Sequence, residues 1–175
     1  MKARYSKVAV LKGGMGSERE VSLKSGEGVA KALRASGVKV EEIDVQGITF
    51  ELPPGVEAVF PVLHGELGED GIVQRRLEEL RLPYVGSRSW EMPRSFDKEI
   101  THALLERYQV PMPEWEMVEP GCLVSLSAPL VLKAPRQGSS VGLEIVKFQQ
   151  DIAVALERVR AFDPRILAEK FIEGT

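Results

Sequence analysis

The residues best suited to chemistry lie in the stretch PLVLKAPRQGSSVGLEIVK, residues 129–147. Lys133 ends an apolar run, where a buried ammonium is costly unless an anion meets it. The loop after it offers a glycine, hydroxyls and outward-pointing backbone N–H groups, which suit a polyphosphate; these residues are Gly138, Ser139 and Ser140. An edge-strand lysine that reaches water would explain Lys133 equally well, and no standard phosphate-loop pattern matches the stretch. Both interpretations stay open on this stretch alone.

A second motif, GGMGSEREVSLKSG, spans residues 13–26. Glycines between an apolar run and a helix start resemble a dinucleotide fingerprint, but Arg19 stands where the third glycine belongs. Glu18 and Glu20 in the first helical turn would also repel a pyrophosphate. Glu18 therefore either complements the helix dipole or holds the ammonium group of a ligand.

A third motif, HGELGEDG, spans residues 64–71 and contains three glycines that let backbone approach a ligand. His64, Glu66, Glu69 and Asp70 are potential metal ligands, yet no nearby second histidine or cysteine completes a site. We expect a hydrogen-bonded network that orients the first loop, and no metal.

The fourth motif is Ser95-Phe96-Asp97-Lys98 at a predicted helix start. Ser95 is expected to cap the helix. Lys98 is either an ordinary solvated lysine or a second cation for the phosphate that Lys133 reaches.

These motifs need elements to position them. The pattern predicts an α/β fold, with strands at 7–12, 38–45, 57–63 and 83–85 and helices at about 17–35 and 73–80. Ser17 and Glu20 have the spacing of a capping box for the first helix. Alternating strands and helices favour a doubly wound parallel sheet, in which Gly13 and His64 follow strand ends at one edge and face one crevice.

The pattern changes near residue 95, so we expect one domain at 1–95 and a second at 96–175. The second should begin with a helix whose apolar face carries Ile100, Leu104 and Tyr108. A strand at 115–118, a hairpin built on Leu130–Leu132 and Val141–Val146, a helix at 151–162 with Ile152, Ala155, Leu156 and Val159 inward, and a strand at 165–172 should follow.

Composition excludes several classes of function. The chain has 175 residues and a net charge of −3, which gives no general attraction to nucleic acid or anionic lipid. The lone cysteine, Cys122, excludes an internal disulfide framework and fits a reducing cytosol. No apolar run is long enough to cross a membrane. We therefore expect a cytoplasmic protein.

Taken together, the four motifs, with Gln74 after the third, resemble the D-alanine–D-alanine ligases of the ATP-grasp superfamily in order and spacing along essentially the whole chain. Ala134-Pro135 and Gln137 depart mildly from the family's usual residues. The resemblance implies a doubly wound N-terminal domain followed by the first part of an ATP-grasp domain.

The resemblance also implies a role for each candidate residue. Glu18 and Ser139 would be catalytic and would orient the first D-alanine, with His64 and Glu69 beside that substrate. The expected ATP-binding residues are Lys98, Lys133, Gly138, Ser139, Ser140, Glu169, Lys170, Phe171 and Ile172, of which 169–172 would read adenine by backbone and acid.

In this family ATP phosphorylates one D-alanine carboxylate, and the amine of a second D-alanine attacks the acyl phosphate to give a peptidoglycan precursor. The family's fold continues past residue 175, so we expect the ligands for Mg²⁺ or Mn²⁺, the arginine for the tetrahedral intermediate and most of the second-substrate site downstream. Residues 1–175 alone are expected not to turn over, and the choice among D-alanine, D-lactate and D-serine stays open. The resemblance further suggests a homodimer.

Overall fold

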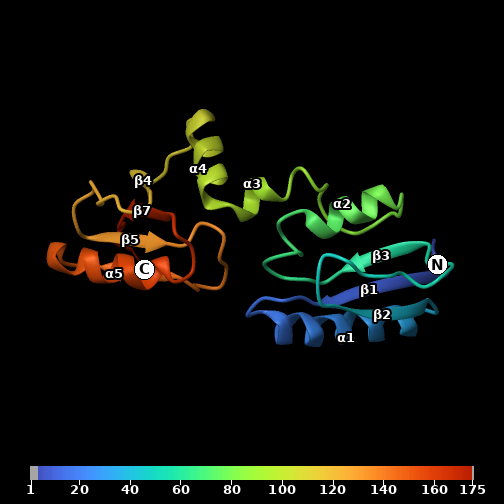
Figure 1. Ribbon diagram of the computed structural model, residues 1–175. Coiled ribbons are helices and arrows are strands. Elements are labelled where there is room, and N and C mark those ends of the chain that lie inside the picture. The colour runs from blue at the N-terminus through green and yellow to red at the C-terminus, as the bar shows by residue number, and fades with distance from the viewer. Residues whose placement is uncertain (1–3, 175) are drawn as a thin grey trace. The chain divides into compact units, whose positions relative to one another are not determined.

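The computed structural model describes residues 4–174 and divides the chain into two compact units, of which the first ends at Pro93 and the second begins at Arg94 (Figure 1). Each unit has its own sheet and its own hydrophobic core. None of the helices described in residues 4–174 is long and apolar enough to span a bilayer.

The first unit is built on a parallel sheet with the order β2-β1-β3. Its strands are β1 (Lys7–Gly13), β2 (Lys39–Val45) and β3 (Ala58–Pro61). The central strand, β1, is buried along most of its length, which explains its nearly continuous apolar run. The predicted parallel sheet is confirmed.

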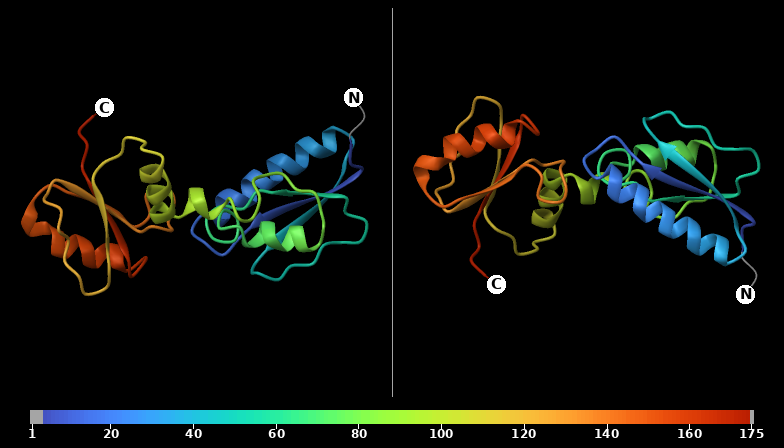
Figure 2. Two further views of the ribbon diagram at one scale, coloured as in Figure 1. Left: turned by 90° about the horizontal axis from the view of Figure 1, so that it is seen from above. Right: turned by 90° about the horizontal axis from the view of Figure 1, so that it is seen from below.

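Two helices cover opposite faces of this sheet, α1 (Arg19–Ala35) and α2 (Ile72–Glu79) (Figures 1 and 2). Alternate residues of β1 point to the two sides. Val8 and Val10 share a core cluster with Ala30 of α1, and the cluster on the other face contains Ala9, Leu11, Val73 and Leu77. The unit is thus doubly wound, as the sequence predicts.

Two local predictions for this unit are wrong. Helix α1 has Glu18 at its N-cap with no side-chain cap hydrogen bond, so the Ser17–Glu20 capping box does not form. The expected strand at 83–85 contributes a single parallel bridge between Tyr84 and Val59, because the chain turns away at once through Gly86.

The second unit contains an antiparallel sheet with the order β4-β7-β5-β6. The predicted hairpin is confirmed, since β5 and β6 pair directly in antiparallel register. The elements in chain order are α3 (Pro93–Phe96), α4 (Lys98–Arg107), β4 (Trp115–Val118), β5 (Leu130–Lys133), β6 (Leu143–Val146), a 3₁₀ turn (Gln149–Asp151), α5 (Ile152–Arg160) and β7 (Ile166–Lys170).

The two faces of this sheet differ in chemistry. Helix α5 covers one face, where its four predicted apolar residues are buried against Leu130, Leu132 and Ala168. Strand alternation sends Lys133 to the opposite face. Glu169 shares that face, because it lies directly across from Val131, two residues before Lys133.

The start of α4 also differs from the prediction. Its N-cap is Asp97, whose side chain accepts a hydrogen bond from the Glu99 N–H over 3.0 Å, whereas Ser95 lies inside α3. The expected apolar face is not buried, since Ile100 is 39% exposed and Tyr108 is 73% exposed.

Candidate functional site

One candidate site lies in the first unit, at the carboxyl ends of β1 and β3. Ser22 of α1 joins the loops that follow these strands. The Ser22 hydroxyl accepts a hydrogen bond from the Gly13 N–H over 2.9 Å and donates to the Val62 carbonyl over 2.6 Å. Ser22 is fully buried. One side chain therefore holds the loop after β1 beside the loop after β3.

Arg19 braces the first of these loops. Its guanidinium donates to the Gly14 carbonyl over 3.1 Å and makes a two-pronged pair with Asp44, at 2.8 and 2.6 Å. This pair lowers the pKa of the Asp44 carboxyl, because the Arg19 N–H groups bond its charged form. Gly13 has a φ of +97°, and a Cβ there would lie 2.2 Å from Asp44 Oδ1, so any other residue would strain the backbone and displace the Asp44 carboxylate.

Glu18 lies at this loop, half-buried at the N-cap of α1. Its Oε2 lies 3.5 Å from the position that a Cβ on Gly65 would occupy. Gly65 has a φ of +63°, the left-handed conformation that glycine adopts without strain. The Glu18 carboxylate thus lies beside the Gly65 backbone, so the loops after β1 and β3 are neighbours at one edge of the sheet, as the sequence predicts.

His64 has unused hydrogen-bonding capacity. Its Nε2 is buried and has no hydrogen-bond partner among the described residues. Its Nδ1 lies 3.9 Å from Glu69 Oε1, which is too long for a hydrogen bond. A small polar ligand could therefore bond to the imidazole without displacing an existing contact.

The rest of the HGELGEDG loop is structural. Asp70 accepts hydrogen bonds from the Leu67 and Ile72 N–H groups, both over 2.9 Å. Buried Gln74 donates to the Gly68 carbonyl over 2.7 Å. Asp70 therefore stabilises the turns of this loop. Residues 4–174 contain no group of three His, Cys, Asp or Glu that could hold a metal.

A second candidate site lies in the second unit, on the sheet face opposite α5. The anion that meets the Lys133 ammonium is the Glu169 carboxylate, through its Oε2. The Glu169 side chain is 8% exposed and that of Lys133 is 24% exposed. Lys133 thus stays partly accessible to solvent, while the Glu169 carboxylate balances its charge.

Lys98 joins Lys133 in this second candidate site. Its Nζ donates to the Gln137 carbonyl over 2.5 Å and lies 3.4 Å from the Pro135 carbonyl, in the loop that follows Lys133. Burial, and then the nearby charge of Lys133, lower the pKa of Lys98 below its ordinary value. The two ammonium groups therefore lie close enough to act on each other.

The loop between β5 and β6 is closed at its base and strained at its tip. The Ala134 N–H donates to the Gly142 carbonyl over 2.8 Å, next to the last residue of β5. Ser139 and Ser140 are exposed and have φ values of +51° and +61°, which are uncommon for residues other than glycine. Residues with such strained backbone conformations are concentrated at active sites and ligand-binding loops.

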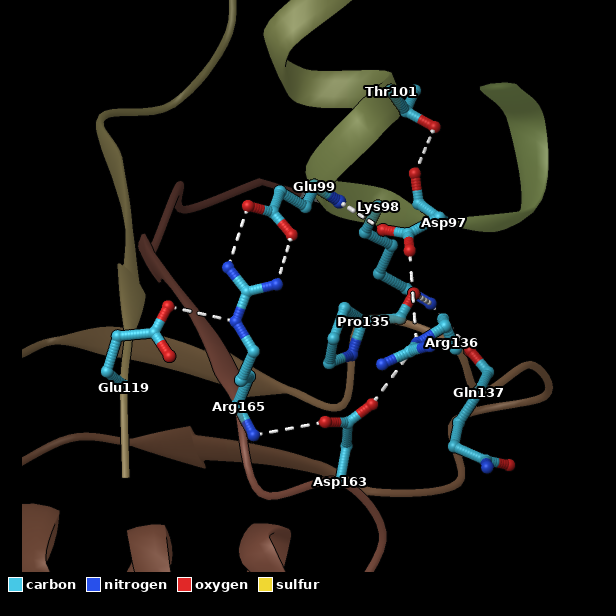
Figure 3. A network of polar contacts seen from close by, with 10 residues as sticks. All are labelled: Asp97, Lys98, Glu99, Thr101, Glu119, Pro135, Arg136, Gln137, Asp163 and Arg165. Atoms are coloured by element: carbon cyan, nitrogen blue, oxygen red, sulfur yellow. Dashed lines mark hydrogen bonds and ion pairs between the residues drawn. The ribbon is translucent and has the colours of Figure 1, made fainter. Parts of the chain in front are cut away.

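Arg136 fastens this loop to the start of α4 (Figure 3). Its Nε lies 3.5 Å from the buried carboxylate of Asp163 and 3.9 Å from that of Asp97. Asp97 caps the helix that carries Lys98. The arginine therefore links the loop to the residue beside the second lysine.

A second arginine secures α4 against the sheet (Figure 3). Arg165 pairs in a two-pronged fashion with Glu99, at 2.7 and 2.8 Å, and with Glu119 over 2.9 Å. These carboxylates raise the pKa of Arg165. Both ends of this contact are half-exposed, so its main effect is to fix the orientation of the helix.

In the stretch 169–172, which runs out of the end of β7, two backbone N–H groups already donate hydrogen bonds. The Lys170 N–H donates to the Glu114 carbonyl over 2.8 Å and the Phe171 N–H donates to the Pro129 carbonyl over 3.1 Å. Ile172 is 65% exposed. Since the carboxylate of Glu169 already holds Lys133, any adenine contact by its acid would compete with that pair.

Comparison with known proteins identifies the family. A family model described as the D-Ala–D-Ala ligase N-terminus matches residues 49–87, and one described as the C-terminus of the same ligase matches residues 101–175. The chain is 40% identical over 178 residues to a D-alanine–D-alanine ligase from Desulforudis audaxviator, of which it covers 58% while 96% of this chain is aligned.

The chain belongs to the D-alanine–D-alanine ligase family.

Other D-alanine–D-alanine ligases show the same kind of partial match. The Bordetella avium ligase is 39% identical over 181 residues, covering 99% of this chain and 57% of the relative. A crystal structure of the Bacillus anthracis ligase complexed with ATP superposes with a TM-score of 0.86 and 28% identity, covering 98% of this chain and 58% of that one. This chain therefore spans somewhat more than half the length of the ligases it matches.

In this ligase-family chain, three residues make contacts that the sequence did not reveal: Ser22, Arg19 and His102. The signal for Ser22 was its place in a stripe of small residues with Gly26 and Ala30, spaced by four and all buried. Nothing in the pattern singled out His102, whose contacts come from three separate elements.

Proposed function

We propose that this chain carries the nucleotide site and the first amino-acid site of an ATP-dependent ligase that joins two D-alanine molecules for peptidoglycan precursor synthesis. The observation that carries the proposal is the convergence of Lys98 and Lys133 beside the strained Ser139–Ser140 loop. Phosphoryl transfer depends mainly on positioning and on neutralising charge on the transferred group. Two ammonium groups from separate elements meet that demand.

The first unit supports the amino-acid side of the proposal. A half-buried Glu18 carboxylate suits the ammonium group of a small zwitterion, and the unpartnered His64 Nε2 offers a hydrogen bond beside it. Glu69 would assist His64, and a role for Ser139 toward the amino acid enters the proposal through the family alone. D-Alanine has the size and charges for such a site.

The proposed reaction has two steps. The substrate carboxylate oxygen attacks the γ-phosphorus of ATP, the bond to the bridging oxygen breaks, and ADP leaves with a D-alanyl phosphate formed. The amine of the second D-alanine then attacks the acyl carbon, loses a proton and expels phosphate. Lys98 and Lys133 would hold the phosphoryl oxygens, and the loop with Gly138, Ser139 and Ser140 would exclude water that hydrolyses the acyl phosphate.

Several features of the complete ligase enter the proposal through the family alone. They are a magnesium ion, a homodimer, a cytoplasmic location and adenine recognition by the backbone of Lys170, Phe171 and Ile172. The described residues supply no three-ligand cluster for the metal, so no step is assigned to it.

A chimera tests the proposal, in which this chain replaces the aligned part of the Desulforudis ligase. We expect ADP release that depends on D-alanine. Lys133→Ala should abolish turnover, since the phosphoryl group loses a cation. Glu18→Gln should raise the D-alanine KM at least tenfold and leave the ATP KM within about twofold, because it weakens an ion pair to the substrate ammonium.

The same assay separates other functions. ATP binding without ADP release on any D-amino acid would indicate a non-catalytic nucleotide-binding module. ADP release with D-lactate or D-serine as second substrate would indicate a related ligase. An equal loss of ATP and D-alanine binding in Glu18→Gln would overturn the assignment of the two sites.

A further inference from the structure

The carboxylate of Glu169 holds two side chains at once. Its Oε2 meets the ammonium of Lys133, and its Oε1 lies 2.5 Å from His102 Nε2. All three side chains are largely removed from solvent, with exposed fractions of 24% for Lys133, 12% for His102 and 8% for Glu169. Glu169 therefore connects a histidine on α4 to a proposed phosphate-binding lysine on β5.

The other ring nitrogen of His102 is also engaged. Its Nδ1 lies 2.6 Å from the main-chain carbonyl oxygen of Lys98, one helical turn earlier. A carbonyl oxygen only accepts hydrogen bonds, and so does an ionised carboxylate. Both ring nitrogens of His102 thus face acceptors, and the doubly protonated imidazolium is the form that donates to both.

Charge balance points the same way. A carboxylate as buried as that of Glu169 needs cationic partners, and Lys133 and a protonated His102 supply one at each oxygen. The ring is further fixed by an edge-on contact with Trp115, with centroids 5.1 Å apart and planes at 62°. The charged groups facing it are Glu169 and Lys133 from the sheet and Lys98 from its own helix.

We propose that His102 is a positioning residue of the phosphate site: as an imidazolium, it ties the helix turn that carries Lys98 to the carboxylate that holds Lys133. The proposal deepens the proposed nucleotide-binding function and rests on it. His102 touches no substrate itself. It sets the separation of the two ammonium groups that do.

One consequence follows. Without a donor at Nε2, Glu169 Oε1 loses its partner and the Lys133–Glu169 pair is free to shift, so ATP binding weakens.

Nuclear magnetic resonance tests the protonation state without any activity assay. The chain has two histidines, so His64→Gln assigns the remaining imidazole. We expect both nitrogens of His102 to be protonated at neutral pH, with an N–H that exchanges slowly, and we expect Glu169→Gln to abolish this state. A neutral ring protonated at one nitrogen would overturn the proposal.

Two substitutions then test positioning by ATP titration calorimetry. In His102→Gln the amide nitrogen can replace Nε2 and donate to Glu169, whereas in His102→Asn it can replace only Nδ1. We expect ATP affinity within about threefold of wild type for Gln and at least tenfold lower for Asn, since a hydrogen bond to a charged group is lost. Equal affinities in Gln, Asn and wild type would overturn the proposal.

If His102→Asn fails to fold, the resonance result and the ATP affinity of His102→Gln decide. Absence of ATP binding in wild type would refute the nucleotide function, while the protonation state of His102 would still be read separately.

Discussion

The Lys98 ammonium donates to the main-chain carbonyl of Gln137 over 2.5 Å, so a lysine of the proposed phosphate site also holds the loop that follows Lys133. An ammonium has three donors, and loop carbonyls take up to two of them. A bound phosphate would therefore draw Lys98 away from the loop or share it. Phosphate binding and loop position are coupled through one side chain.

Removal of this ammonium should loosen the loop. We expect Lys98→Gln to increase hydrogen exchange and proteolytic cleavage within residues 135–141. We also expect a loss of ATP affinity of about ten- to hundredfold, because a charge-assisted contact to phosphate disappears. Hydrogen exchange by mass spectrometry and titration calorimetry measure the two effects.

The matched control is Lys147→Gln, an exposed lysine of the same unit. It should change neither exchange in the loop nor ATP affinity by more than about twofold. Equal effects from the two substitutions would mean that charge in general, and not the Lys98 contacts, governs the loop.

Lys98 should also make ATP binding depend on pH. Burial and the charge of Lys133 lower its pKa below 10.5, so the free chain loses this proton at a lower pH than an ordinary lysine does. Bound phosphate favours the charged form and raises the pKa again, so binding takes up protons at any pH where the free chain has begun to lose the Lys98 proton, and affinity falls as pH rises further.

Calorimetry in two buffers of different ionisation enthalpy measures that uptake. Lys98→Gln should abolish the part that this residue contributes. Identical proton uptake in wild type and Lys98→Gln would contradict the assignment.

Gly142 closes the base of the loop where no side chain fits. A Cβ there would lie 2.9 Å from Ala134 Cβ and 3.1 Å from Phe162 Cβ, on backbone with a φ of +63°. Gly142→Ala should lower the free energy of unfolding of the second unit by about 2–4 kcal/mol, from crowding added to backbone strain. Gly121→Ala, at φ +80° with open space around it, should cost about 1 kcal/mol from strain alone.

Chemical unfolding that follows Trp115 fluorescence, in a Trp90→Phe background, measures both variants. A Gly142→Ala variant no less stable than Gly121→Ala would show that the loop base has room to adjust.

Ser22 should be essential to the shape of the first unit. Ser22→Ala leaves the Gly13 N–H and the Val62 carbonyl without their buried partner, which costs about 1–3 kcal/mol of unfolding free energy. Exposed Ser36→Ala removes only a bond to the Ala32 carbonyl and should cost less than about 0.5 kcal/mol. Similar thermal unfolding midpoints for the two variants would contradict this role.

The sequence predicted most of the fold because its periodicities were strong. The buried run of β1 and the α5 stripe with Ile152 and Val159 specified their elements directly. Helix starts were less predictable, since Ser17 and Ser95 have the right chemistry for caps while Glu18 and Asp97 occupy those positions. Such local choices depend on contacts made elsewhere, such as the Lys98 N–H bond to the Pro135 carbonyl.

The candidate site shows the same division. Lys133 was conspicuous as a charge in an apolar strand, and it did require an anion. Strand register and helix packing make Glu169 that anion and place His102 at its other oxygen. No local sequence pattern encodes these contacts.

We propose that the second unit binds phosphate and that the first unit binds the amino acid. Titration calorimetry of ATP into wild type, Lys133→Gln and Glu18→Gln tests it most directly. We predict at least a tenfold loss of affinity for Lys133→Gln and a change within about twofold for Glu18→Gln. Unchanged affinity in Lys133→Gln, or an equal loss in both variants, would contradict the account.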